Sequence, residues 1–213
     1  MRIRSYVKRK LKNADIAHAF DHIEYVVNLA KRIGKAEGAN LGILIPAAYF
    51  HDVAFRGKKF VNHTERSAYE AEKFLKNLGF TETEINKIRE IIISSSYESY
   101  ERGIKPKSLE AKVLRDADWL EAMGARGIGR AFVFGTHYGS KEMGEVSWDP
   151  ENPVKLKLNL KGADPSPIHH FFSKLLWLRN GMQTKTGRKM AEGRHKLMVK
   201  FLKQYKSECE GKT

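Results

Sequence analysis

The stretch AAYFHD, residues 47–52, places a histidine and an aspartate directly after a run of small and aromatic residues. Pro46 comes just before it, where a helix can begin because its first position needs no N–H donor. We therefore expect a helix that starts at Pro46 and carries His51 on the same face as Ala47 and Phe55. A histidine on an otherwise apolar face indicates a buried polar site.

Two more predicted helices repeat this feature. In the helix expected over residues 15–36, His22 lies on the apolar face in line with Val26. In the helix expected to start near Ser108, Asp118 occupies the same kind of position. A carboxylate in the interior must be paired, hydrogen-bonded or bound to a metal, because an isolated buried charge is costly.

The rest of the chain is predicted to be helical with one interruption. Further helices are expected over about 64–78, from the capping-box pattern TETE at 81–84, and over about 125–138, 166–180 and 184–208. Residues 139–165 are richer in Gly, Pro, Asp and Asn, and inside them VKLKLNL, residues 154–160, alternates as a strand does.

These patterns predict an all-α fold, a helical bundle with a small irregular or β-hairpin insertion. We expect a single domain over residues 1–213, with a core at about 15–135, the insertion at about 139–165 and C-terminal helices at about 166–208.

Composition narrows the class of protein. The single cysteine, Cys209, cannot form an internal disulfide, and no apolar run reaches the roughly 18 residues of a membrane span. We therefore expect a cytoplasmic protein with no membrane contact. The net charge of +14 favours an anionic partner such as a nucleotide, a phosphate ester or nucleic acid, although a solvated lysine-rich surface would give the same balance.

The polar residues on the apolar faces form a plausible ligand set for one divalent cation. Two imidazoles and two carboxylates suit Mn, Fe, Co, Ni or Zn better than Ca, and Mg is a further candidate. An octahedral ion held by four protein ligands keeps positions open for water and a substrate oxygen. The expected metal ligands are His22, His51, Asp52 and Asp118.

The order of these residues resembles that of the HD-domain metal-dependent phosphohydrolases. The resemblance rests on His22, the His51-Asp52 pair and Asp118 within RDADWL, residues 115–120. The segments GARGIGRAF and TGRKMAEGRHKL, which begin at residues 124 and 186, are similar to the nucleotide-hydrolysing bacterial and archaeal branch.

This resemblance implies an HD-type helical bundle and an enzyme that hydrolyses a phosphomonoester or phosphoanhydride, with a nucleotide as the expected substrate. The reaction would proceed by attack of a metal-bound water. Two other classes stay open. One is a basic nucleic-acid-binding or regulatory module that keeps the metal site without turnover, and the other is a helical adaptor without metal. A homo-oligomer is possible.

Roles for individual residues follow from the same resemblance. Asp52 and Asp118 would act in catalysis as well as in metal binding. His63 would be a general acid or an anion contact, or simply a residue at a helix start. His63 is also the sole histidine between the His51-Asp52 pair and Asp118, which favours one metal over two.

The candidate phosphate-binding residues are arginines. Arg126 and Arg130 are one helical turn apart and could clamp a phosphate, or they could belong to an exposed basic face. Arg66 is a weaker candidate of the same kind. Asp116 is placed in the second shell of the metal, with a ligand role as the alternative, and the pair at residues 169–170 is assigned no role.

Overall fold

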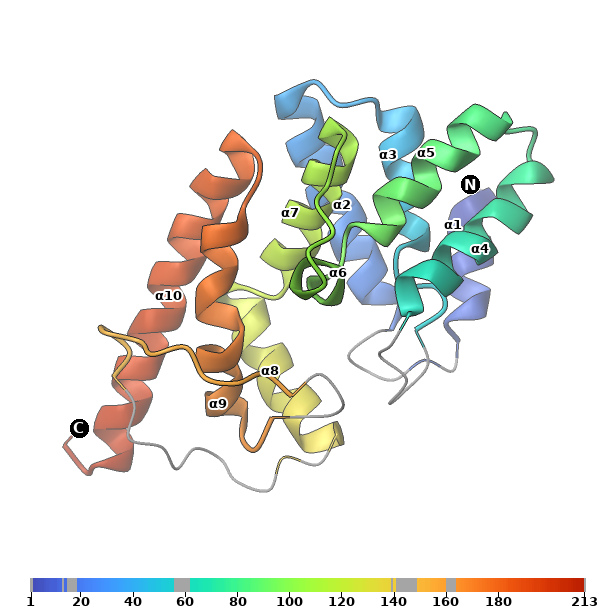
Figure 1. Cartoon of the computed structure of the whole chain (residues 1–213). Helices are drawn as coiled ribbons and strands as arrows, with labels where there is room; N and C mark the ends of the chain where they lie inside the picture. The colour runs from blue at the N-terminus through green and yellow to red at the C-terminus, as the bar shows by residue number, and fades with distance from the viewer. Residues whose placement is uncertain are drawn as a thin grey trace.

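The structure is a computed structural model that describes residues 2–12, 14, 19–55, 62–138, 140, 149–159 and 164–212. The described residues fold into helices and connecting segments, so the all-α prediction is confirmed (Figure 1). In chain order the elements are α1 Arg2–Lys10, α2 Phe20–Glu37, α3 Leu41–Phe50, α4 His63–Lys76, α5 Glu82–Ile93, α6 Tyr97–Glu101, α7 Leu109–Glu121, α8 Gly124–Tyr138, α9 Pro167–Ser173, the 3-10 helix η1 Leu175–Gly181 and α10 Lys185–Cys209.

The helices form a central group flanked on two sides. Helix α2 packs against both α3 and α7, and these three helices occupy the middle of the molecule (Figure 1). Helices α1, α4 and α5 cover the α3 side, while α8, α9, η1 and α10 lie on the α7 side. The core therefore forms where the apolar faces of α2, α3 and α7 meet.

Local sequence signals explain several helix ends. The capping box at the start of α5 is confirmed, because the Glu84 N–H donates to Thr81 Oγ1 at 3.3 Å and the Thr81 N–H donates to Glu84 Oε2 at 2.8 Å. Helix α2 ends at Gly38, which has a φ of 80° that a side chain with a Cβ would disfavour.

Helix α3 begins earlier than the proline suggested. Its N-cap is Asn40, whose side chain accepts the N–H of Gly42 at 2.9 Å, so Pro46 lies inside the helix and not at its first position. The prediction of a start at Pro46 was wrong, because an N-cap side chain satisfies the free N–H groups upstream and the helix tolerates one missing bond at the proline. The helix ends at Phe50, which leaves His51 and Asp52 at its C-terminal end.

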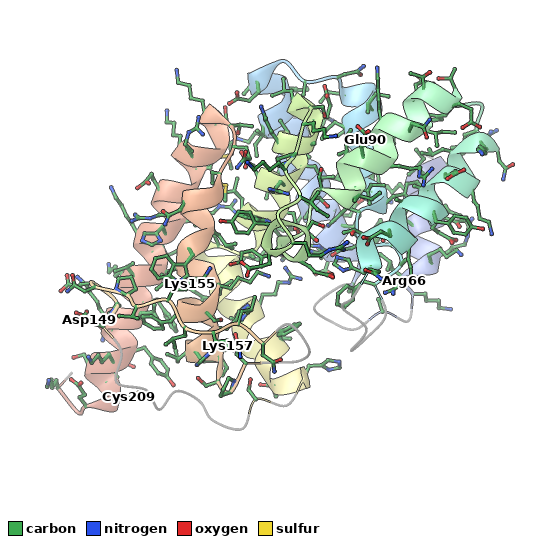
Figure 2. The ribbon with its side chains drawn as sticks, in the orientation of Figure 1. Arg66, Glu90, Asp149, Lys155, Lys157 and Cys209 are labelled. Carbon is green, nitrogen blue, oxygen red and sulfur yellow. The ribbon has the colours of Figure 1, made fainter. Side chains whose placement is uncertain are left out.

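The strand predicted at 154–160 does not form in the part that the structure describes. Residues 154–159 form an extended segment without a ladder, and its Leu156 N–H donates to Phe172 O at 3.2 Å. The alternation arises because Leu156 and Leu158 pack on the core while Lys155 and Lys157 are exposed (Figure 2). Residue 160 and most of 139–148 lie outside the described residues.

The predicted helix over 166–180 is divided in two. Helix α9 stops at Ser173, and Lys174 has φ −140° and ψ −58°, outside helical geometry, before η1 begins. The break at Lys174 separates α9 from η1. Among the described residues, no helix combines the length and the apolar character that crossing a bilayer requires.

Candidate metal centre

Three separate elements bring the predicted ligands together. His22 comes from the first turn of α2, His51 and Asp52 from the end of α3, and Asp118 from α7. His22 Nε2 lies 3.2 Å from His51 Nε2, and Asp118 Oδ1 lies 3.8 Å and 3.7 Å from these two nitrogens. Asp52 Oδ2 approaches the same two nitrogens at 3.5 Å and 3.7 Å.

Both imidazoles are oriented by contacts at their far nitrogens. His51 Nδ1 donates to the carbonyl oxygen of Ala48 at 2.7 Å. His22 Nδ1 lies 3.2 Å from Glu121 Oε2. In each ring, Nδ1 lies next to an oxygen acceptor, which leaves Nε2 as the nitrogen with the lone pair. The two Nε2 atoms face one another, as in histidines that bind a metal.

This arrangement fits a divalent cation. Ligand bonds of about 2.0–2.2 Å around a tetrahedral or octahedral ion place neighbouring ligand atoms roughly 3.0–3.6 Å apart, close to the spacings here. The ligand atoms of His22, His51 and Asp118 all lie within 4.8 Å of one another. Two facing lone pairs need a positive charge between them. A proton on His22 can supply it. Burial and Arg130 lower the pKa of His22, but Glu121 and Asp52 outweigh them and raise it to about 9.

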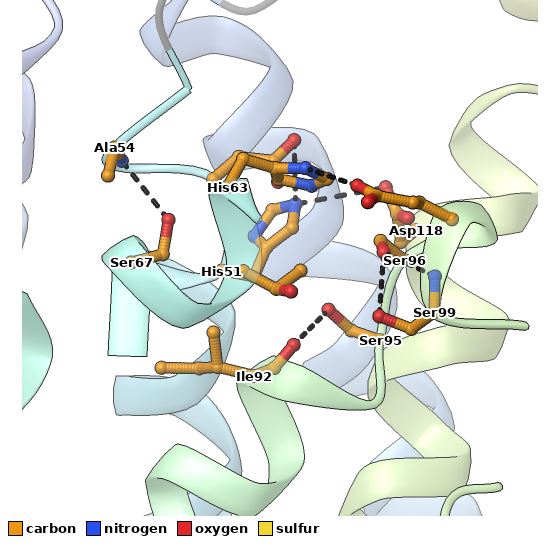
Figure 3. A network of polar contacts seen from close by, with 12 residues as sticks. His51, Ala54, His63, Ser67, Ile92, Ser95, Ser96, Ser99 and Asp118 are labelled. Carbon is orange, nitrogen blue, oxygen red and sulfur yellow. Dashed lines mark hydrogen bonds and ion pairs between the residues drawn. The ribbon is translucent and has the colours of Figure 1, made fainter. Parts of the chain in front are cut away.

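Asp52 joins this cluster to His63. The Oδ1 atom of Asp52 lies 3.4 Å from His63 Nε2, and His63 Nδ1 lies 3.3 Å from Glu98 Oε2. Burial raises the pKa of Asp52, but His51, His22 and His63 together hold it well below its usual range. His63 is the first residue of α4 and also lines the cavity beside the cluster. Figure 3 shows His51, His63 and Asp118 close to one another in the network of polar contacts.

Glu121 is one functional candidate that sequence reasoning missed. Its side chain is fully buried. Glu121 lies in α7 three residues after Asp118, so the two side chains are near the same helix face. It contacts His22 and also pairs with Arg126 Nε at 2.9 Å and with Arg130 Nη1. Burial raises the pKa of Glu121, but His22 and the arginines lower it far below normal. The i, i+3 spacing from Asp118 was the available signal.

The three arginines predicted to bind phosphate differ in whether they line the cavity. Arg130 lines the cavity while it pairs with Glu121. Arg126 is not among the described lining residues, and its guanidinium stacks 3.9 Å from the ring centroid of Tyr25. Arg66 is exposed on α4 and is also not among those residues (Figure 2).

Asp116, expected near the metal, lies in α7 with its carboxylate against the residues that begin α10. It is fully buried, and its carboxylate accepts the N–H of Gln183 at 2.8 Å, the N–H of Thr184 at 2.8 Å and the hydroxyl of Thr184 at 2.6 Å. Its position about 200° around α7 from Asp118 directs it to the opposite side of the helix. Asp116 thus connects α7 to α10.

The cluster opens into a cavity of about 190 Å³. Its lining combines polar residues with apolar side chains such as Trp119, Phe134 and Leu178. His170, to which the sequence assigned no role, reaches this lining from α9 together with Lys174. Sequence reasoning missed both because their helix is brought to the cavity by packing alone.

Known proteins are similar to this chain in sequence and in fold. The family description "HD domain" matches residues 19–123. Protein YpgQ of Bacillus subtilis is 33% identical over 210 residues, which cover 98% of this chain and 93% of YpgQ. The chain belongs to the HD-domain superfamily.

Solved HD-domain structures agree along nearly the whole chain. The crystal structure of YpgQ in complex with ADP has a TM-score of 0.72 and 31% identity, covering 97% of this chain and 93% of that one. An HD-superfamily hydrolase from Bacillus thuringiensis has a TM-score of 0.71 and 29% identity, covering 98% and 95%. These relatives support assignment of this HD domain to the hydrolases.

Proposed function

We propose that this protein is a metal-dependent phosphohydrolase that cleaves a phosphoester or phosphoanhydride bond of a nucleotide. The observation that carries the proposal is the convergence of His22, His51, Asp52 and Asp118 beside a cavity that His22, Asp52 and Asp118 also line. The ADP bound to the relative YpgQ supports a nucleotide as the substrate.

The chemistry divides between the cation and the chain. When bound, a divalent cation polarises a phosphoryl oxygen and acidifies a water molecule. His22, His51, Asp52 and Asp118 would hold it, and the contacts of Ala48 O and Glu121 keep both imidazoles facing it. The carboxylates of Asp52 and Asp118 border the cavity, where each can orient the attacking water or accept its proton.

His63 is the residue we assign to the leaving oxygen. It lines the cavity, and its ring is held between Asp52 and Glu98 at 3.4 Å and 3.3 Å. A ring that is fixed by carboxylates on both nitrogens can deliver a proton without reorientation. His63→Gln should therefore lower kcat more than it changes cation affinity.

The test is release of phosphate and pyrophosphate from nucleoside mono-, di- and triphosphates with Mn²⁺, Co²⁺, Ni²⁺, Mg²⁺ or Zn²⁺. Wild type is compared with Asp52→Ala and with the matched control Asp149→Ala, which removes an exposed carboxylate far from the cluster (Figure 2). We expect cation-dependent turnover in wild type and in the control, and a loss of at least about 100-fold in Asp52→Ala. Cation binding without release from any nucleotide would refute the proposal.

A further inference from the structure

A wall of basic side chains lies in the same cavity as the carboxylates and imidazoles of the cluster. It is formed by Lys174, just after α9, by His170 within α9 and by Arg130 of α8. Arg130 already pairs with Glu121, so its charge is partly neutralised within the protein. Lys174 and His170 therefore decide what this wall can bind.

Lys174 is a partly buried cation that forms no ion pair with the part of the chain that the structure describes. Among the described residues, no carboxylate oxygen lies within 4.0 Å of its Nζ, which sits 5.0 Å from the ring centroid of Tyr97. Burial lowers the pKa of Lys174, although Asp118 and Asp164 act in the opposite direction from a distance. A desolvated ammonium costs free energy unless it meets an anion, so its place on the cavity lining indicates an anionic ligand.

His170 is held in a fixed orientation by Asp164. His170 Nδ1 donates to Asp164 Oδ2 at 2.8 Å, and the same carboxylate accepts Ser173 Oγ at 2.6 Å and the Asn159 N–H at 2.9 Å. Asp164 is buried, and its partners keep it fixed on this side of the fold. Because Nδ1 is occupied, Nε2 is the ring atom left for a ligand that enters the cavity, and it donates to an anion when the ring takes up a second proton. Burial lowers the pKa of His170, whereas Asp164 raises it, and an anion bound beside the ring would favour the second proton as well.

The two sides of the cavity therefore differ in what they can hold. The cluster side takes one phosphoryl group through a cation, as argued under the proposed function. The α9 side offers the ammonium of Lys174, which complements further phosphate oxygens, and the ring of His170, which does so once an anion favours its protonation. A substrate with one phosphate would engage the first side alone, while a chain of two or more phosphates could engage both.

We propose that Lys174 and His170 form an anion subsite that binds the phosphate groups of the substrate beyond the one held by the cation. This inference rests on the proposed function for the identity of the ligand, and it narrows that function to substrates with a phosphate chain. Asp164 is a positioning residue that orients His170 and does not contact the substrate.

The test measures binding of inorganic pyrophosphate by calorimetry in the presence of EDTA, so that no turnover is needed. Lys174→Met and His170→Phe remove the polar groups but keep the volume and, for the ring, the contact with Phe134 at 6.2 Å between centroids. Lys189→Met is the matched control, because Lys189 is exposed on α10 and is not among the described lining residues. Thermal unfolding and Mn²⁺ titration establish that each variant is folded and retains the cluster.

We expect Lys174→Met to weaken pyrophosphate binding by about tenfold or more, Lys174→Arg to restore part of it, and Lys189→Met to leave it unchanged. Inorganic phosphate should bind more weakly and respond less to the substitution. Unchanged pyrophosphate binding in a folded Lys174→Met, or no binding to wild type, would overturn the subsite. Either result leaves cation-dependent nucleotide hydrolysis standing, whereas pyrophosphate binding without any hydrolysis would leave the subsite and remove the proposed function.

Discussion

Glu121 contacts three charged side chains at once, and this makes it decisive at the scale of single residues. It contacts His22 at Nδ1 and pairs with the partly exposed Arg126 and Arg130. A buried carboxylate with these partners fixes which nitrogen of His22 faces the cluster. The geometry of the ligands therefore depends on a residue that binds no cation itself.

Glu121→Gln should lower Mn²⁺ affinity by about 10- to 100-fold, because the amide aligns His22 less strongly and removes the negative charge that Arg126 and Arg130 share. Calorimetric titration with Mn²⁺ measures the effect. Glu90→Gln is the matched control, because Glu90 is exposed on α5 (Figure 2). Equal Mn²⁺ affinity in Glu121→Gln and Glu90→Gln would show that Glu121 does not position His22.

The contribution of Asp164 to the free energy of unfolding should depend on pH. Burial raises the pKa of Asp164, but His170, Ser173 and the Asn159 N–H together lower it below its usual value. A carboxylate with a lowered folded pKa adds stability above the unfolded value of about 3.9, and this stability is lost as the pH falls through the folded pKa. The difference in unfolding free energy between wild type and Asp164→Asn should be largest near pH 6–7 and should shrink below about pH 4. Urea unfolding across this range checks it, and a gap that widens in acid would contradict the sign.

At the scale of elements, α10 is attached to α7 through Asp116. Its carboxylate accepts two backbone N–H groups at the start of α10, and Gly187 lies so close that a Cβ there would be 2.2 Å from Asp116 Oδ2. The free N–H groups of a helix start need acceptors when they are buried. Asp116 supplies one from another helix and thereby fixes where α10 begins against the core.

Asp116→Ala should lower the free energy of unfolding by about 2–4 kcal/mol, because it leaves buried N–H groups of Gln183 and Thr184 without an acceptor. Urea unfolding compares it with Asp149→Ala, whose carboxylate accepts the N–H of Glu151 at an exposed turn. The control should lose no more than about 1 kcal/mol. Losses of equal size in the two variants would exclude a special role for Asp116 in docking α10.

At the scale of the whole molecule, a bound cation would join three helices that are far apart in the chain. His22 lies in α2, His51 follows α3 and Asp118 lies in α7, and these helices form the centre of the fold. A ligand that binds only the folded state stabilises it by mass action. Cation binding should therefore be visible in global unfolding.

Mn²⁺ at about 100 times its Kd should add about 2.7 kcal/mol, which for a chain of this size raises Tm by about 5–10 °C. Asp118→Asn should show a much smaller rise, and EDTA should abolish the rise in wild type. Differential scanning calorimetry measures these shifts. A rise of the same size in Asp118→Asn would place the stabilising ion at another site.

The sequence by itself determined the helical class and the identity of the polar residues at the cluster. A period of 3.6 residues records which face of each helix is buried, and His22, His51 and Asp118 break that apolar pattern. Their cation-binding role stays a proposal, but their proximity follows from burial of the three faces in one core. The sequence was misleading at Pro46 and at residues 154–160, because a local pattern does not show whether an upstream cap or a partner strand is present.

Only the tertiary structure decided the surroundings of the cluster. Glu121, His170 and Lys174 acquire their roles from the packing of α7, α8 and α9 around one cavity. Arg126 and Asp116 are engaged by Glu121 and by the start of α10, contacts that no spacing along the chain displays. The physical reason is that side-chain charge is paired through space, so its partner depends on how the helices pack and not on their individual patterns.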